Sequence, residues 1–150
     1  MNDVPAITAL RLALLAEEAR RPLFAEPASN VRYRARRLTA MQVAGYHEVV
    51  FVATAGPRVI GMLRCVAVSG SPLVRNGRHA VLTTAYVRRA FRRRGVLARL
   101  LRAADAWCRA RGLCDMRLHC AVNNTVGNAT WSALGFSPVE IRHRRFVPVG

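Results

Sequence analysis

An arginine-rich loop between two apolar segments is the part of this chain whose residue types could do chemistry. Arginines at positions 92–94 and then Gly95 follow a β-branched segment that ends at Val87, and an amphipathic segment begins at Val96. In a strand–loop–helix arrangement, the backbone N–H groups of the loop and of the first helical turn converge on one point, where the helix dipole favours negative charge. Gly95 lets the backbone approach a ligand closely because it carries no Cβ. The pattern predicts a phosphate-binding site.

Three other residues could take up a proton, either directly or through water. Glu48 lies next to the start of a predicted strand, although a solvated turn carboxylate is the alternative interpretation. His79 precedes another predicted strand and is expected in an exposed loop. His119 alternates with Leu118 and Cys120, so it faces one side of a predicted sheet. None of the three lies in a recognisable motif.

The cysteines Cys65, Cys108, Cys114 and Cys120 contain no Cys-x-x-Cys pair. This spacing argues against a zinc knuckle and against a disulfide scaffold. The last three could in principle surround a metal together with His119, but zinc ligands normally come in closer pairs. We therefore expect reduced, mostly buried thiols, no metal, and a cytoplasmic protein.

Length and composition limit the possible classes of protein. The chain has 150 residues, enough for one core, and we expect residues 1–150 to form a single domain. Hydrophobic residues make up 52% and charged residues 21%, which excludes a disordered chain. No apolar run approaches the ~18–20 residues of a membrane span. Residues 1–6 lack the features of a secretory signal.

Basic residues outnumber acidic ones by 24 to 8, which gives a net charge of +16. All of the basic residues are arginine and the sequence has no lysine, which indicates a coding bias before it indicates a function. The positive field nevertheless attracts polyanions, so a nucleic-acid-binding module is one alternative. Aromatic residues are only 7%, and no helix-turn-helix or base-stacking motif is present. We expect non-specific attraction to nucleic acids at most.

The elements that must position the loop follow from the spacing of apolar residues. β-branched and aromatic runs predict five strands, at residues 49–53, 59–68, 80–87, 116–122 and 139–147. Helical spacing and capping residues predict four helices, from Asp3 to before Pro22, from Ser29 or Asn30 to about Gly45, over 96–112, and near 128–134. The first two strands form a hairpin, and the helix at 96–112 makes a strand–helix–strand crossover. The fold class is mixed α/β.

The loop pattern can be written Val87-x4-Arg92-x-Arg94-Gly95-Val96, and a later pattern reads Val122-Asn123-Asn124-x6-Trp131 followed by Leu134-Gly135-Phe136. The first resembles the acyl-CoA-binding motif of the GNAT superfamily of N-acetyltransferases, and the second resembles that family's later motif of Asn, a short helix and an aromatic residue. The resemblance covers roughly residues 46–147. It implies a central, mostly antiparallel, twisted sheet with a splayed pair of parallel strands, flanked by about four helices. The chain opens on a segment that resembles the one after the family's first strand, so we expect that strand to be missing, either truly or through a mis-set start.

The resemblance also implies an activity. Acetyl-CoA would be the co-substrate, and a primary amine of a small molecule or protein would attack its thioester directly in a ternary complex. A bulge in the strand ending at Val87 would splay it from strand 116–122, so that the cofactor binds in the opening. The cofactor-binding residues would be Tyr86, Val87, Arg92, Arg93, Arg94, Gly95, Val96, Leu97, Ala98, Asn124 and Trp131. The candidate catalytic residues are Glu48, His119 and Ser132.

The chain departs from the family's pattern at two positions inside these motifs. Leu97 stands where the family usually has Gly or Ala. Trp131 stands where many members have a tyrosine that protonates the departing thiolate; an indole cannot supply that proton, and Ser132 and Tyr86 are poorer substitutes. A positioned acid contributes about 10²–10⁴ in rate, less than the roughly 7–11 kcal/mol that correct placement of the reactants supplies. We therefore expect Trp131 to pack and the protein to be an enzyme, with a CoA-binding sensor or partner subunit as the alternative.

The acceptor is expected to bind against the loop and second helix around residues 24–37 and against the last hairpin. Four arginines in that region could favour an amine that carries a carboxylate, or could form an ordinary solvated helix face: Arg32, Arg34, Arg36 and Arg37. We expect no association with membranes, and a homodimer is an open alternative to a monomer.

Overall fold

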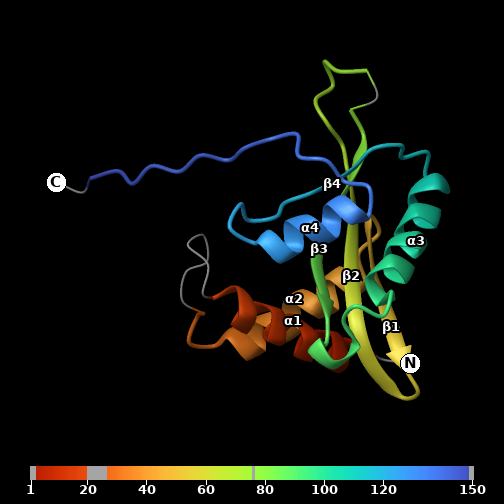
Figure 1. Ribbon diagram of the computed structural model, residues 1–150, viewed down its shortest axis with the longest axis vertical. Helices are drawn as coiled ribbons and strands as arrows, with labels where there is room; N and C mark the ends of the chain where they lie inside the picture. The colour runs from red at the N-terminus through yellow and green to blue at the C-terminus, as the bar shows by residue number, and fades with distance from the viewer. Residues whose placement is uncertain (1–2, 20–26, 76, 149–150) are drawn as a thin grey trace. The chain divides into compact units, whose positions relative to one another are not determined.

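The computed structural model describes residues 3–19, 27–75 and 77–148 (Figure 1). Contacts divide the chain into two compact units, Met1–His119 and Cys120–Gly150. The first contains α1 (Val4–Glu18), α2 (Val31–Val43), β1 (Glu48–Ala55), β2 (Arg58–Val68), β3 (His79–Val87), the 3₁₀ turn η1 (Arg89–Phe91), α3 (Val96–Arg109) and β4 (Met116–Leu118). The second contains α4 (Thr125–Ala133). None of the helices in the described ranges combines the length and the apolar character needed to cross a bilayer.

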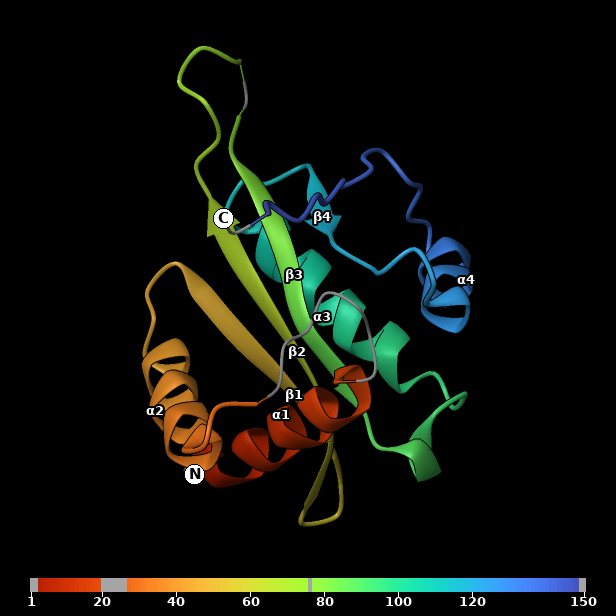
Figure 2. The ribbon, with the colours of Figure 1, turned by 90° about the vertical axis from the view of Figure 1, so that its left-hand side faces the viewer.

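The strands of the first unit form one sheet in the order β1-β2-β3-β4 (Figure 2). β1 and β2 pair antiparallel, as do β2 and β3, whereas β3 and β4 pair parallel. The parallel pair is connected through α3, as a crossover connection requires. The predicted fold class, a mixed α/β protein with a mostly antiparallel sheet and one parallel pair, is confirmed.

Helices cover both faces of this sheet (Figures 1 and 2). On one face, Ile7 and Leu10 of α1 pack against Val59 and Met62 of β2. On the other face α3 packs against the strands, and it buries Val96, Leu100, Leu101, Ala104 and Cys108. A strand covered on both faces is apolar throughout instead of alternating, and this explains the unbroken buried run of β2 over residues 59–63.

A bulge in β3 determines where the sheet opens. The register of β2 and β3 shifts by one residue between the Met62–Tyr86 pair and the Arg64–Thr83 pair. Thr84 lies within this shift and has a φ of 51°, in the left-handed region. An extra residue of this kind bends and twists the strand that carries it. The bulge expected in the strand ending at Val87 is therefore present.

β3 continues well past the end of β4. The two strands pair only at residues 80–82 of β3. In the described part of the chain, residues 83–87 therefore have no neighbouring strand on that side. A strand edge with unpaired N–H and C=O groups can hydrogen-bond an extended ligand.

Two predicted strands differ from the structure. The strand predicted at 116–122 is only Met116–Leu118, because its pairing with β3 ends at Leu118. The prediction of a strand at 139–147 is wrong: these residues have no regular secondary structure, and Val139, Ile141, Phe146 and Val147 are exposed. β-branched residues form a strand when they pair and bury one face, and the end of the chain does neither.

Candidate functional site

The end of β3 is fixed to β2 by backbone and side chain. The Arg88 N–H donates to the Ile60 carbonyl at 2.8 Å, and Arg88 Nε donates to the Val59 carbonyl at 3.1 Å. Val87 is buried, and a Cβ added at Gly61 would lie only 3.3 Å from its side chain. The loop after β3 therefore starts from a firmly packed point.

The backbone between β3 and α3 presents N–H groups that the protein itself does not use. Arg93 and Gly95 have φ of 60° and 71°, and α3 begins without a side-chain cap or an acidic residue in its first turn. Within the described ranges, the N–H groups of residues 93–98 donate no hydrogen bond, and the helix ladder starts with Arg99 N to Gly95 O at 3.1 Å. Such free N–H groups at a helix N-terminus bind anions. The donor set fits a diphosphate.

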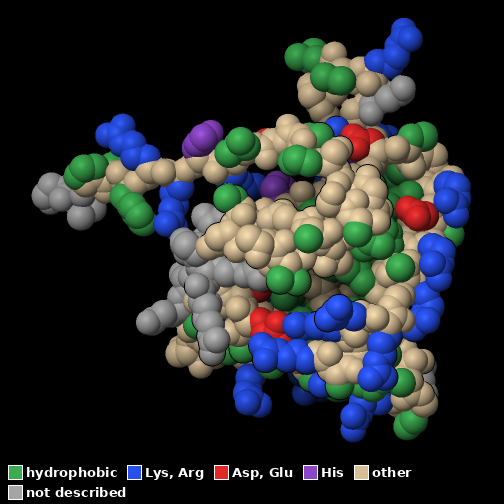
Figure 3. Space-filling view, in the orientation of Figure 1, with side chains coloured by type: hydrophobic (Ala, Val, Ile, Leu, Met, Phe, Trp, Pro, Cys, Tyr) green, Lys and Arg blue, Asp and Glu red, His purple; other side chains and the backbone are tan. Residues whose placement is uncertain are grey.

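Arginine side chains surround these N–H groups. Arg93 and Arg94 are exposed, and the Arg94 guanidinium carbon lies 5.9 Å from the centre of the Phe91 ring. Figure 3 shows basic side chains gathered over the loop between β3 and α3. Leu97 and Ala98 are half-buried in the first turn of α3. The exposed positive charge adds to the helix dipole in favouring an anion.

Arg92 is bound differently from its neighbours. Its Nε donates to the Val87 carbonyl at 2.8 Å, and its Nη2 donates to both carboxylate oxygens of Glu17, at 2.9 Å each. Glu17, in the last turn of α1, also accepts from the Tyr86 hydroxyl at 3.0 Å and from Arg89 Nε at 3.2 Å. The Arg92 guanidinium carbon lies 5.3 Å from the centre of the Tyr86 ring. One carboxylate thus connects α1, β3 and the loop.

These contacts change the pKa values of both acids in the cluster. Burial alone would raise the pKa of Glu17, but hydrogen bonds from Arg92, Tyr86 and Arg89 outweigh it and hold that pKa below its ordinary value. Burial, together with the hydrogen bond to Glu17 and its charge, raises the pKa of the Tyr86 phenol. At neutral pH, Glu17 is therefore an anion and Tyr86 keeps its proton.

Glu48 is held in an ion pair. It accepts a hydrogen bond from Arg64 Nε, and both side chains are 18% exposed. Arg64 Nη1 also donates to Thr83 Oγ1 at 3.0 Å. Because Glu48 lies on β1, Arg64 on β2 and Thr83 on β3, this pair bridges three strands. The structure gives Glu48 a structural role, and its catalytic role stays a prediction.

In the second unit, Asn124 and Trp131 are used to build α4. Asn124 Oδ1 accepts from the Gly127 N–H at 3.0 Å and caps the helix. The rings of Trp131 and Phe136 meet edge to face with their centres 5.5 Å apart. The Phe136 N–H also donates to the Trp131 carbonyl at 3.0 Å. Trp131 therefore packs within its own unit.

A sequence model of the acetyltransferase (GNAT) family matches residues 12–136, which is most of the chain. The chain belongs to the GNAT acetyltransferase family. The resemblance inferred from the two motifs is therefore confirmed, and membership supports acetyltransferase activity in general terms. No curated protein sequence matches the chain.

Several solved GNAT-type structures are similar over nearly the whole chain. The apo aminoglycoside 6'-N-acetyltransferase AAC(6')-IG of Acinetobacter haemolyticus is 18% identical with a TM-score of 0.77, over 99% of this chain and 94% of that one. A predicted acetyltransferase of Clostridium acetobutylicum, solved with acetyl-CoA, is 16% identical with a TM-score of 0.77, over 96% and 90%. AAC(6')-Iy, solved with the bisubstrate analogue CoA-S-monomethyl-acetylneamine, is 20% identical with a TM-score of 0.73, over 97% and 92%. At such identities the likeness shows the fold.

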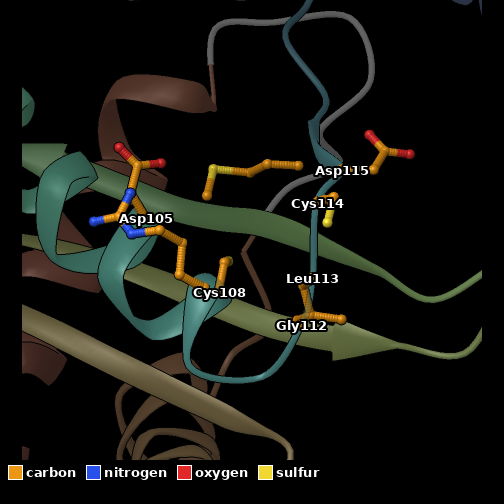
Figure 4. Close-up of a pocket in the computed structure, with 8 residues that line it drawn as sticks. Asp105, Cys108, Gly112, Leu113, Cys114 and Asp115 are labelled. Atoms are coloured by element: carbon orange, nitrogen blue, oxygen red, sulfur yellow. The ribbon is translucent and has the colours of Figure 1, made fainter.

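A pocket of about 340 Å³ lies at the opposite, C-terminal end of α3 in this GNAT chain (Figure 4). Asp105 and Cys108 of α3 line it, with Cys114 and Asp115 from the segment before β4. None of the predicted site residues lines this pocket. Its two carboxylates outnumber the one arginine of the lining, Arg109, and together with the negative end of the helix dipole they disfavour a phosphate group. The pocket is therefore distinct from the candidate cofactor site.

The predicted residues fall into separate places. Those from Tyr86 to Ala98 lie together at the β3–α3 junction. His119, at the end of the first unit, and Ser132, on α4, are both exposed. In the described ranges, no three His, Cys, Asp or Glu side chains gather as a metal site would require.

Glu17 is the functional candidate that sequence reasoning missed. It is one of only 8 acidic residues in the chain, and its place in the last turn of a helix is the only local signal. Nothing in the sequence connects position 17 with position 92.

Proposed function

We propose that this GNAT protein transfers the acetyl group of acetyl-CoA to a primary amine. The observation that carries the proposal is the β3–α3 junction. A strand edge at residues 83–87, without a neighbouring strand among the described residues, runs directly into the unused N–H groups of residues 93–98. The strand edge can hydrogen-bond a pantetheine arm and the N–H groups can bind a diphosphate. Coenzyme A carries these two groups next to each other.

The rate of this reaction depends more on positioning the amine and the thioester than on an acid that protonates the leaving thiolate. Acetyl-CoA supplies the acetyl group as an activated thioester. The amine nitrogen forms a bond to the acetyl carbon, the C–S bond breaks, the sulfur keeps the electron pair, and the nitrogen loses a proton to a base or to water. A thiol has a pKa of about 8.5, so its thiolate leaves without a strong acid. Holding the two reactants in attack geometry can supply roughly 7–11 kcal/mol.

The proposal assigns roles to the chain's own residues. The backbone at Tyr86 and Val87 would bind the pantetheine arm. Arg92, Arg93, Arg94, Gly95, Val96, Leu97 and Ala98 would hold the diphosphate. Asn124 and Trp131 would complete the cofactor site, while Glu48, His119 and Ser132 stay the candidates for proton transfer.

The charge of the chain favours an anionic acceptor. Two of the proteins described above, AAC(6')-IG and AAC(6')-Iy, are aminoglycoside acetyltransferases, and an aminoglycoside carries several amino groups. A net charge of +16 repels polycations and attracts amines that carry a carboxylate or phosphate. Exposed arginines on α2 add to this preference locally: Arg32, Arg34, Arg36 and Arg37. We therefore propose an amine with an acidic group as the acceptor, free or within a protein.

A cytoplasmic location is part of the proposal, because the thiols are unbonded. The Sγ atoms of Cys65 and Cys108 lie 3.9 Å apart without a disulfide. A second candidate function is a CoA-binding sensor or partner subunit. The Arg64–Glu48 ion pair favours it, because it ties up the carboxylate that could have served as a base.

Calorimetric titration with acetyl-CoA, followed by an assay of free thiol release with a panel of amines, tests the proposal. The panel should contain amines with and without a carboxylate, and an aminoglycoside. We expect binding, and thiol release with acidic amines above the hydrolysis background. Binding without release would support the sensor, and absence of binding would refute both.

A further inference from the structure

Glu17 is a carboxylate placed inside a cationic anion-binding region. Tyr86, Arg89 and Arg92 donate hydrogen bonds to it. Its side chain is 28% exposed, against 39% for Arg92 and 76% for Arg89. A negative group here opposes the positive potential that the loop and the α3 N-terminus create.

Arg92 connects this carboxylate to the strand edge. Its Nη2 binds both oxygens of Glu17 at 2.9 Å, while its Nε binds the Val87 carbonyl at 2.8 Å. In this conformation the guanidinium hydrogen-bonds the Val87 carbonyl, which belongs to the proposed pantetheine site. The Glu17 carboxylate neutralises its positive charge. The Nε and Nη2 of Arg92 are thus both engaged by groups of the protein itself.

A guanidinium group can bind either a carboxylate or a phosphate through two parallel N–H donors, so the two anions can compete for the same arginine. We propose that Glu17 is a positioning residue of the cofactor site: it holds Arg92 in the unliganded protein, and the diphosphate of acetyl-CoA takes its place. This inference rests on the proposed function, since it requires that the β3–α3 junction binds acetyl-CoA. Because Glu17 belongs to α1, the exchange transmits the arrival of the cofactor to the helix that precedes the proposed acceptor region.

A double-mutant cycle on acetyl-CoA affinity, measured by calorimetry, tests the exchange. Glu17→Gln keeps an oxygen for the Tyr86 hydroxyl but loses the charge that binds Arg92. We expect it to tighten acetyl-CoA binding about three- to tenfold. Arg92→Gln should weaken binding, and Glu17→Gln should then have no further effect in the Arg92→Gln background.

The matched control is Asp115→Asn, which removes one carboxylate from an exposed ion pair with Arg117 near β4. It makes the same change in net charge, so it should leave the affinity unchanged. Unchanged or weaker binding by Glu17→Gln would overturn the inference. So would a tightening that persists in the Arg92→Gln background, because the effect would then not act through Arg92.

An NMR titration of the unsubstituted protein tests the same exchange without relying on the variants. The NMR signal of Arg92 Nε–H, assigned by its loss in Arg92→Gln, should shift and saturate with acetyl-CoA. A signal that stays constant through saturation would overturn the exchange even if Glu17→Gln did not fold. If the unsubstituted protein does not bind acetyl-CoA, the proposed function fails, which is distinct from binding that ignores Glu17.

Discussion

The two ends of α3 differ in the property that decides what each can bind. At the N-terminal end, Gly95 has a positive φ, the following N–H groups are unused, and the loop carries arginines. At the C-terminal end a pocket of about 340 Å³ is lined by Asp105, Asp115 and two cysteines. At 1.5 Å per residue, the helix separates the two by about 20 Å. This pocket lies at the end of the helix whose dipole repels an anion.

On this contrast, polarity rather than volume is our reason for placing the proposed diphosphate site at the N-terminal end of α3. Both ends of α3 have a glycine in the left-handed region, since Gly112 has a φ of 66° and Gly95 a φ of 71°. The same left-handed glycine therefore stands beside the proposed anion site at one end and ends the helix at the other. The comparison can be tested by changing both ends in parallel.

The largest expected effect comes from Gly95→Val. A Cβ at Gly95 meets nothing within 4 Å, so the change acts through backbone strain alone, which costs about 1–2 kcal/mol in the left-handed region. The strain moves the N–H groups of the first turn, and we expect acetyl-CoA affinity to fall about tenfold or more. Gly112→Val is the matched control, because it has the same φ region and the same open surroundings. It should lose similar stability in urea unfolding and keep its affinity; equal loss of affinity in both would break the comparison.

The buried thiols of Cys65 and Cys108, near the C-terminal end of α3, should make the free energy of unfolding fall at alkaline pH. Burial raises the pKa of the Cys65 thiol to about 12, against about 9 when exposed. The folded state therefore favours the neutral thiol, and this contribution is complete below pH 9 and is lost as the pH rises from about 9 to about 12. At pH 10 the free energy of unfolding should drop by about 1 kcal/mol relative to pH 8.

Urea unfolding at the two pH values measures this drop. Cys65→Ala should reduce it, although the buried Cys108 thiol, whose pKa burial also raises, remains, and the variant starts from lower stability because it leaves a cavity. Cys114→Ala, at an exposed thiol, should retain it in full. A drop of equal size in Cys65→Ala would assign the alkaline effect to another group.

Removing a positive charge at the N-terminal end of α3 should lower acetyl-CoA affinity more than removing one at its C-terminal end. Arg94→Gln removes an exposed cation beside the free N–H groups, and we expect about threefold weaker acetyl-CoA binding at low salt. Arg109→Gln removes an exposed cation in the last turn of α3 and should change the affinity little. The difference should shrink near 1 M salt, where the screening length is about 3 Å. Equal weakening by both variants would mean that net charge alone attracts the ligand.

The smallest expected effect is on the stability of the protein at acid pH, through Glu17 beside the N-terminal end of α3. The pKa of Glu17 lies below its ordinary value in the folded protein, so its contribution is present above about pH 4.3 and is lost as the pH falls through the folded value. The free energy of unfolding should therefore fall more in the unsubstituted protein than in Glu17→Gln between pH 5 and pH 3, by a small amount because the carboxylate is partly exposed. Parallel unfolding curves for the two proteins would show that the cluster adds nothing to stability.

Local patterns were enough to predict most of the fold. The helix start at Gly95, the hairpin of β1 and β2, and the parallel crossover follow from turn residues and periodicity, which short segments carry on their own. The strand predicted at 139–147 failed because a strand also needs a partner, and no local pattern contains that information. The same reason shortens β4, whose pairing with β3 stops at Leu118. That residues 1–150 form a single domain stays a prediction.

The candidate site was predictable where it is built from consecutive residues. The segment from Arg92 to Ala98 is such a stretch, and its motif was visible. The contacts of Arg92 with Glu17 and of Arg64 with Glu48 join residues far apart in the sequence. These contacts depend on how α1 and the strands pack. The sequence therefore showed which residues are charged but could not predict which of them form ion pairs.

The arginine-only surface has a consequence for any transfer reaction carried out here. The basic side chains around the proposed thioester site are all guanidinium groups, since the chain has no lysine. Guanidinium groups stay protonated at every physiological pH and do not act as nucleophiles. The protein therefore offers no lysine side chain on which to label itself, and any acetyl-lysine detected in a reaction mixture must come from another molecule.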